Sequence, residues 1–158
     1  MKIAPATGGK DFEGTLEALK RGDVKLLFVF GSCLGDLPAD EVKELLSKAE
    51  YVVNIAPNES PVSEASTLVL PSASFAEKEG TYTNFKGRVQ RFFRAFPPRY
   101  AAKDDLEILT RLARKLGASW EFKTAEEVFA ELAGREPFFA GLSYQTVGYY
   151  GIQVGEKV

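Results

Sequence analysis

Histidine is absent from the 158-residue chain, and cysteine occurs once, as Cys33. Without an imidazole, the chain has no Ser-His-Asp triad, no Cys-His pair and no zinc site that includes histidine. A single cysteine makes no internal disulfide, and it supplies one thiolate where an iron–sulfur cluster generally takes four. Several classes of enzyme chemistry are therefore excluded for this chain alone, and any iron–sulfur cluster is expected on another chain.

Long apolar runs are also missing. The longest run extends only from Leu26 to Phe30, whereas crossing a bilayer takes roughly 20 residues. The first nine residues contain no apolar stretch typical of a secretion signal. We therefore expect a cytoplasmic protein with no direct membrane insertion.

Neither sign of charge dominates, because 20 basic and 22 acidic residues leave a net charge of −2. This balance argues against a polycationic nucleic-acid binder, and we expect no nucleic-acid partner. The segment from Phe85 to Lys103 nevertheless holds six basic residues and no acidic one. It contains four candidate interaction residues: Lys86, Arg88, Arg91 and Arg94. The alternative is a solvated basic face over an aromatic core, and the sequence leaves both open.

Three apolar segments predict buried strands, at 24–30, 51–55 and 67–70. Pro71 is expected to stop the last of them. A helical pattern precedes the first strand, and a second one begins at Pro38. The order strand, helix, strand implies parallel crossover connections. Because the first strand is apolar on both faces, we expect it to be covered on both.

Polar and apolar residues alternate over 81–84 and 88–92, which predicts a hairpin or a paired extended loop. Between them, Gly87 suits the positive φ of a tight turn. Two later helices are expected to end before Gly117 and before Gly134. They begin with capping-box pairs, Asp104 with Glu107 and Thr124 with Glu127.

These elements predict an α/β fold with a small parallel sheet, Rossmann-like, three-layered and incomplete. Crossover helices, an inserted hairpin or extended loop, and C-terminal helices complete it. With 45% hydrophobic residues, a chain of this length suits one domain with its own core. We expect a single domain over 1–158, with 118–158 as a less regular C-terminal extension.

The turn after the first strand, residues 31–36, lies where open parallel sheets bind ligands. It matches neither the dinucleotide glycine pattern nor a phosphate loop, so an ordinary strand-to-helix turn is the main alternative. Several carboxylates lie near the strand ends or the hairpin: Glu59, Glu64, Glu77 and Glu79. A converging pair could do acid–base work, but solvated surface acids are the default expectation.

The run from Leu68 to Asn84, continuing to Phe92, closely resembles a signature of molybdopterin-type oxidoreductases. Its Glu-Gly-Thr-Tyr-Thr-Asn and Gly-Arg-Val-Gln segments are most similar to the large G subunit of bacterial NADH:quinone oxidoreductase, respiratory complex I. The resemblance covers about residues 12–117. It departs at Gly31-Ser32-Cys33-Leu34, where pterin-binding members often carry Gly-x-Asn-Pro. Whole family members are also several times longer, so the chain resembles one lobe of such a body.

The resemblance implies a non-catalytic structural module in the peripheral electron-transfer arm of a complex I-like assembly. Its expected partners are other subunits of the redox complex, or a second copy of the chain. The chain itself is expected to bind no cofactor, with iron–sulfur clusters and FMN only on partner chains or missing regions. Through such a complex it would lie at the inner membrane, on the cytoplasmic side.

Two alternatives stay open. In the first, the chain supplies part of a molybdopterin or nucleotide site in a formate-dehydrogenase-like enzyme. That site would be lined by polar residues near the strand ends and the hairpin: Ser32, Asn58, Glu59, Ser72 and Asn84. In the second, the chain is an adaptor whose basic hairpin binds an acidic protein.

Overall fold

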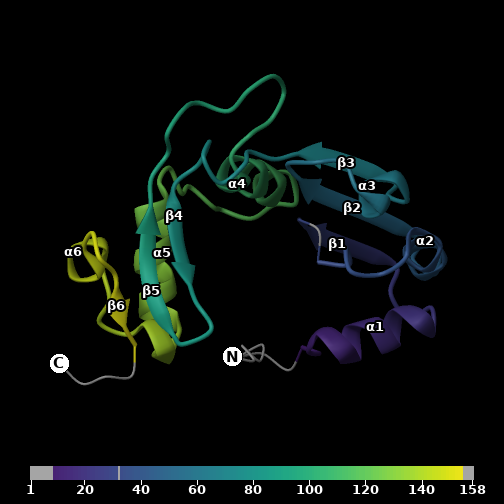
Figure 1. The fold of residues 1–158 in the computed structure, drawn as a ribbon, viewed down its shortest axis with the longest axis horizontal. Coiled ribbons are helices and arrows are strands. Elements are labelled where there is room, and N and C mark those ends of the chain that lie inside the picture. The colour runs from purple at the N-terminus through teal and green to yellow at the C-terminus, as the bar shows by residue number, and fades with distance from the viewer. Residues whose placement is uncertain (1–8, 32, 155–158) are drawn as a thin grey trace. The chain divides into compact units, whose positions relative to one another are not determined.

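The computed structural model describes residues 9–31 and 33–154 and has a mixed α/β fold (Figure 1). It divides into two compact units, with the boundary along the chain between Ser72 and Ala73. We call them the N-terminal unit and the C-terminal unit.

The N-terminal unit is built on a parallel sheet in the order β1-β2-β3 (Figure 1). Its elements are α1 (Phe12–Lys20), β1 (Leu26–Phe30), α2 (Ala39–Leu46), β2 (Tyr51–Ala56), α3 (Pro61–Glu64) and β3 (Leu68–Pro71). The expected parallel pairing is confirmed, with Phe28 opposite Val53 and Val53 opposite Leu68. The third strand ends at Pro71 as predicted, and the proline is itself the last residue of β3, opposite Ala56.

The main apolar cluster of this unit lies on one face of the sheet. Val29 and Val52 pack there against side chains of all three helices, including the fully buried Val42 and Val62. On the other face, Leu26, Phe30 and Leu68 are 53%, 48% and 50% exposed. The described residues therefore do not cover β1 on both faces, contrary to the expectation from its apolar sequence.

The C-terminal unit contains an antiparallel sheet in the order β4-β5-β6. Its elements are β4 (Gly80–Thr83), β5 (Arg88–Phe92), α4 (Asp105–Lys115), α5 (Ala125–Arg135), the 3-10 helix η1 (Pro137–Phe139), α6 (Tyr144–Val147) and β6 (Ile152–Gln153). The predicted hairpin is confirmed, with Thr83 opposite Val89 and Gly87 at a φ of 84°. β6, which the sequence did not predict, pairs with β5.

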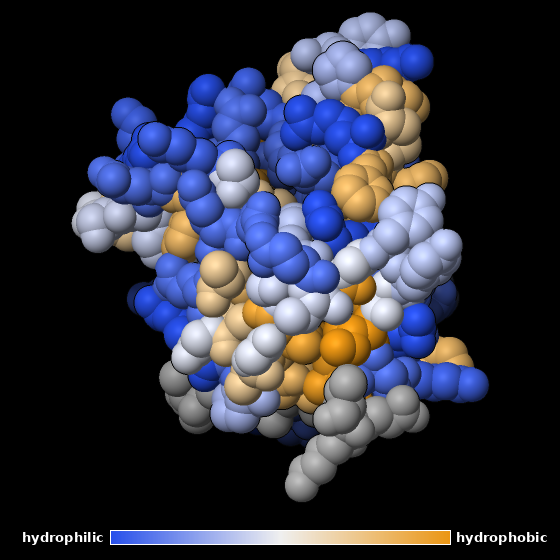
Figure 2. All heavy atoms as spheres, turned by 90° about the vertical axis from the view of Figure 1, so that its left-hand side faces the viewer, coloured by the Kyte–Doolittle hydropathy of each residue, from blue (hydrophilic) through white to orange (hydrophobic). Residues whose placement is uncertain are grey.

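A second core holds the C-terminal unit together. Val89 of the hairpin is fully buried there with Phe129, Phe139, Tyr144 and Val147. Residues after Arg135 therefore contribute to a packed core, although their sequence shows no clear period. On the side of α6 and β6, apolar side chains gather on the surface among hydrophilic ones (Figure 2).

The helix ends agree with the sequence only in part. α4 ends before Gly117 as expected, and Thr124 and Glu127 form the predicted capping box of α5. The Asp104 side chain caps α4 by accepting from the backbone N–H of Leu106. The predicted capping box is not formed there, because the Glu107 carboxylate pairs with Lys103 and Arg111. The prediction that the later helix ends before Gly134 is wrong, because α5 continues to Arg135.

We predict that Leu46→Ala lowers the free energy of unfolding by about 2–5 kcal/mol, because it leaves a cavity in a packed core. Leu26→Ala, which truncates the same side chain at a half-exposed position, should cost less than about 1.5 kcal/mol. Urea titrations followed by circular dichroism would measure both. Equal losses for the two variants would contradict this one-sided core.

Candidate functional site

The three parallel strands of the N-terminal unit end at one edge of the sheet, where such sheets bind ligands. Asn58 and Glu59 follow β2 and are exposed to solvent. Ser72 follows β3 and is buried, and its backbone N–H donates to the carbonyl of Ala56 at 3.1 Å. The fold thus brings three of the five candidate site residues to one edge. Ser32 lies outside the described residues.

Asn54 is a polar residue of this sheet whose importance the sequence analysis missed. It is fully buried in β2, and its amide nitrogen donates to the carbonyls of Val29 at 3.1 Å and Gly31 at 3.3 Å. Its side-chain oxygen is buried and has no hydrogen-bond partner among the described residues. The sequence held one signal for it, because Asn54 is the only side-chain amide within the apolar segment of β2. Asn54 ties the ends of β1 and β2 together and leaves one acceptor for an N–H group.

The chemistry of this edge favours one kind of ligand group. Within 33–36, 57–60 and 72, the side chains offer an amide, hydroxyls and carboxylates, and none is basic. Amides, hydroxyls and carboxylates match the N–H and carbonyl groups of a heterocyclic ring. Phosphates are instead usually held by arginine, lysine or backbone N–H groups. The edge therefore suits the ring of a nucleotide or pterin better than its phosphates.

Asn84, the fifth candidate, lies in the hairpin of the C-terminal unit. Its side-chain oxygen accepts hydrogen bonds from the backbone N–H groups of Lys86 at 2.9 Å and Arg88 at 3.0 Å. A side chain that satisfies two turn amides in this way fixes the turn. The structure therefore gives Asn84 a role in closing the hairpin.

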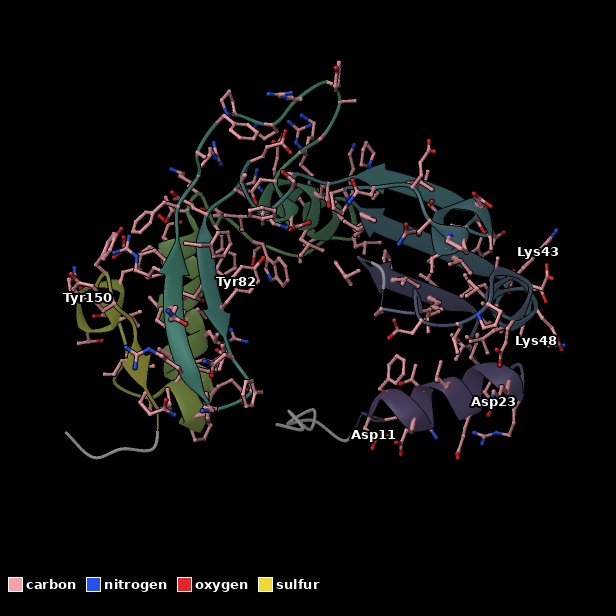
Figure 3. The ribbon with its side chains drawn as sticks, viewed as in Figure 1. Asp11, Asp23, Lys43, Lys48, Tyr82 and Tyr150 are labelled. Atoms are coloured by element: carbon pink, nitrogen blue, oxygen red, sulfur yellow. The ribbon has the colours of Figure 1, made fainter. Side chains whose placement is uncertain are left out.

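Two of the basic candidates make contacts within their own unit. The Arg88 guanidinium donates to the carbonyls of Tyr150 at 2.8 Å and Gly151 at 3.3 Å. Arg91 lies over the ring of Tyr144, with its guanidinium carbon 4.2 Å from the ring centroid. Tyr150 lies on the α6 side of the hairpin, and Tyr82 lies on β4 (Figure 3). Both arginines thereby join the hairpin to residues 144–151.

The other two basic candidates are more accessible. Lys86 is exposed in the hairpin turn, where its ammonium lies 5.7 Å from the ring centroid of Phe85. Arg94 is exposed after β5, and its guanidinium pairs with the carboxylate of Asp104 at 3.2 Å. Binding of an acidic partner by these four residues remains a prediction.

Glu77 is the carboxylate whose surroundings differ most from a solvated surface acid. Only 8% of it is exposed, and its two oxygens accept from the backbone N–H groups of Ser74 at 2.9 Å and Arg99 at 3.1 Å. These hydrogen bonds hold the pKa of the Glu77 carboxyl below its ordinary value. The ionised side chain joins two loops of the C-terminal unit.

Two observations concern metal ligands and the cysteine thiol in the part of the chain that the structure describes. Those residues contain no group of three or more histidine, cysteine, aspartate or glutamate side chains that could hold a metal ion. Desolvation raises the pKa of the Cys33 thiol, which disfavours the reactive thiolate.

None of the described helices is both long and apolar enough to cross a membrane.

Comparison with known proteins gives a consistent result. The family model described as molybdopterin oxidoreductase matches residues 4–115. Two proteins named "putative formate dehydrogenase" are similar over most of the chain: one of Staphylococcus haemolyticus is 31% identical over 93% of it, and one of Bacillus subtilis is 33% identical over 88%. A "probable oxidoreductase" of Bacillus subtilis is 31% identical over 94%. The aligned regions span only 15%, 14% and 15% of these relatives.

We predict that Glu77→Gln makes the C-terminal unit less stable at pH 7 and less sensitive to acid. Because folding lowers the pKa of Glu77 below 4.5, its contribution is complete above that pH and is lost as pH falls through the lowered value. Thermal unfolding between pH 7 and pH 3 would test this. Glu79→Gln, at an exposed neighbour, should keep the acid sensitivity of the parent chain. Parallel pH profiles for all three proteins would refute the role of Glu77.

We also predict that Asn84→Ala lowers the free energy of unfolding by about 1–2 kcal/mol, because two turn amides lose their acceptor. Asn84→Asp retains an acceptor oxygen and should lose less. Urea unfolding followed through the fluorescence of Trp120, the chain's single tryptophan, would report on this unit. An equal loss for both variants would show that the acceptor is not what matters.

Proposed function

Because the chain belongs to the molybdopterin oxidoreductase family, we propose that it is one lobe of a larger, formate-dehydrogenase-like oxidoreductase. In that enzyme the lobe supports and lines part of the cofactor site, and the redox step takes place on groups outside this chain. One observation carries the proposal: about nine-tenths of the chain matches proteins named "putative formate dehydrogenase", of which it spans about one-seventh.

The carboxyl edge of the parallel sheet is the part of the lobe that we assign to the cofactor. Asn58, Glu59 and Ser72 would hold a ring of the molybdopterin cofactor or its nucleotide through hydrogen bonds. When bound, the cofactor supplies the redox centre. The chain's own contribution is to orient that ring and to keep the edge rigid through the buried amide of Asn54.

Other prosthetic groups are assigned elsewhere. A single cysteine and no histidine supply too few ligands for an iron–sulfur cluster. We therefore propose that any such clusters, and any FMN, belong to other parts of the enzyme or to other subunits of a redox complex.

A second candidate function is a non-catalytic scaffold similar to the G subunit of respiratory complex I, in its peripheral arm. Two features of the sequence favour it: the resemblance of residues 79–90 to that subunit, and a turn after β1 that lacks the Asn-Pro of pterin-binding members. The two candidates differ in one measurable property, which is whether the assembled protein holds a pterin.

Molybdenum, tungsten and released pterin should be measured on protein purified together with its natural partners. Under the leading proposal, the metal and the pterin are stoichiometric with the chain. Metal-free and pterin-free material that stays attached to dehydrogenase subunits would reject it in favour of the scaffold.

We predict that Asn58→Ala or Glu59→Gln weakens pterin binding and so lowers the pterin content of this assembly. Each loss of about 1.4 kcal/mol of binding free energy lowers the affinity about tenfold. Glu50→Gln, at an exposed residue before β2, is the control and should leave the content unchanged. Circular dichroism would check that each variant is folded. Full pterin content in both site variants would argue that this edge does not touch the cofactor.

A further inference from the structure

A pocket of about 470 Å³ lies entirely within the C-terminal unit, along α4 and the segment before α5. It involves none of the residues assigned to the cofactor above. Its lining is strongly charged, with four cationic and two acidic side chains: Arg94, Arg111, Arg114, Lys123, Asp104 and Glu107. The lining therefore has an excess of two positive charges.

The two carboxylates are already engaged. Asp104 pairs with Arg94 at 3.2 Å, and Glu107 pairs with Arg111 at 2.6 Å. Within the described residues, no carboxylate lies within ion-pair distance of Arg114 or Lys123. The excess positive charge is therefore located on these two residues.

Arg114 is held in place by a contact that leaves its charge unpaired. Its Nε donates to the backbone carbonyl of Trp120 at 2.8 Å, which connects α4 to the segment before α5. Its two terminal nitrogens make no hydrogen bond among the described residues. A planar guanidinium fixed in this way loses little further side-chain entropy when its remaining N–H groups bind an anion.

Thr110 provides an independent observation in the same pocket. It lines the pocket from α4, and it is only 7% exposed. Its hydroxyl is buried and has no hydrogen-bond partner among the described residues. Buried hydroxyls are rarely left unpaired, because losing water without a replacement partner is unfavourable. Rotation of the Thr110 side chain would bring its hydroxyl to a ligand oxygen in the pocket, which would supply that partner.

We propose that this pocket binds a phosphate group of a small ligand, held by Arg114 and Lys123 with the hydroxyl of Thr110 as a further donor. A phosphate offers several acceptor oxygens and up to two negative charges, which match two unpaired cations and a hydroxyl. The volume accommodates a diphosphate or a small phosphorylated molecule. The proposal does not depend on the proposed function.

The test uses the full chain at fixed ionic strength, titrated with inorganic phosphate, pyrophosphate or ADP by calorimetry and ³¹P NMR. Arg114→Gln and Lys123→Gln should each weaken binding by about tenfold, which corresponds to about 1.4 kcal/mol. Arg21→Gln, which removes an equal charge from the N-terminal unit, is the matched control and should bind like the parent. Thr110→Val, which removes the hydroxyl, should weaken binding. Thr110→Ser, which keeps the hydroxyl, should bind like the parent.

The outcomes separate the sources of the anion. Equal affinities for phosphate and pyrophosphate would support a single phosphate subsite, and tighter binding of ADP would support a nucleotide ligand. Millimolar or weaker binding of all three probes, or an equal loss in Arg21→Gln, would overturn the proposal. Binding of a polyglutamate peptide without binding of any phosphate would also overturn it and would indicate an acidic protein partner. Circular dichroism of each variant excludes unfolding as the cause of a loss.

Discussion

Parallel pairing of β2 with both β1 and β3 is the constraint on which the arrangement of the N-terminal unit depends. Parallel strands need crossover connections, so α2 and α3 must pass over the sheet, and their apolar side chains bury Val29 and Val52. The same pairing brings the carboxyl ends of all three strands to one edge. The residues that we assign to the cofactor are at that edge only because the strands run in one direction.

The C-terminal unit is stabilised in a different way, by polar side chains that bind backbone groups of loops and turns. Glu77 joins two loops, Asn84 closes the hairpin turn, and Arg88 binds carbonyls beyond α6. All three residues belong to the stretch that most resembles the oxidoreductase family. Their contacts within the unit account physically for the presence of these residue types.

The family and the length of its members together define what the chain can contribute. Under the proposed function, a lobe with one cysteine and no histidine would contribute shape and hydrogen bonds, and the redox step would use groups from elsewhere. The exposed apolar side chains of Leu26, Phe30 and Leu68 are consistent with such a lobe, because sheet faces of this kind are normally covered. The unpaired cations of the C-terminal unit add a binding capacity that the family relationship does not itself explain.

Local patterns in the sequence determined the strands, the hairpin with Gly87 and the capping box of Thr124, because these depend on neighbouring residues. They missed β6, which forms because β5 offers it an unpaired edge. They also ended α5 too early, because a single glycine inside a helical pattern is tolerated. The fate of charged residues was equally a tertiary matter. The sequence shows that Arg88, Arg114 and Glu77 carry charge, but only packing determines which backbone groups each of these side chains binds.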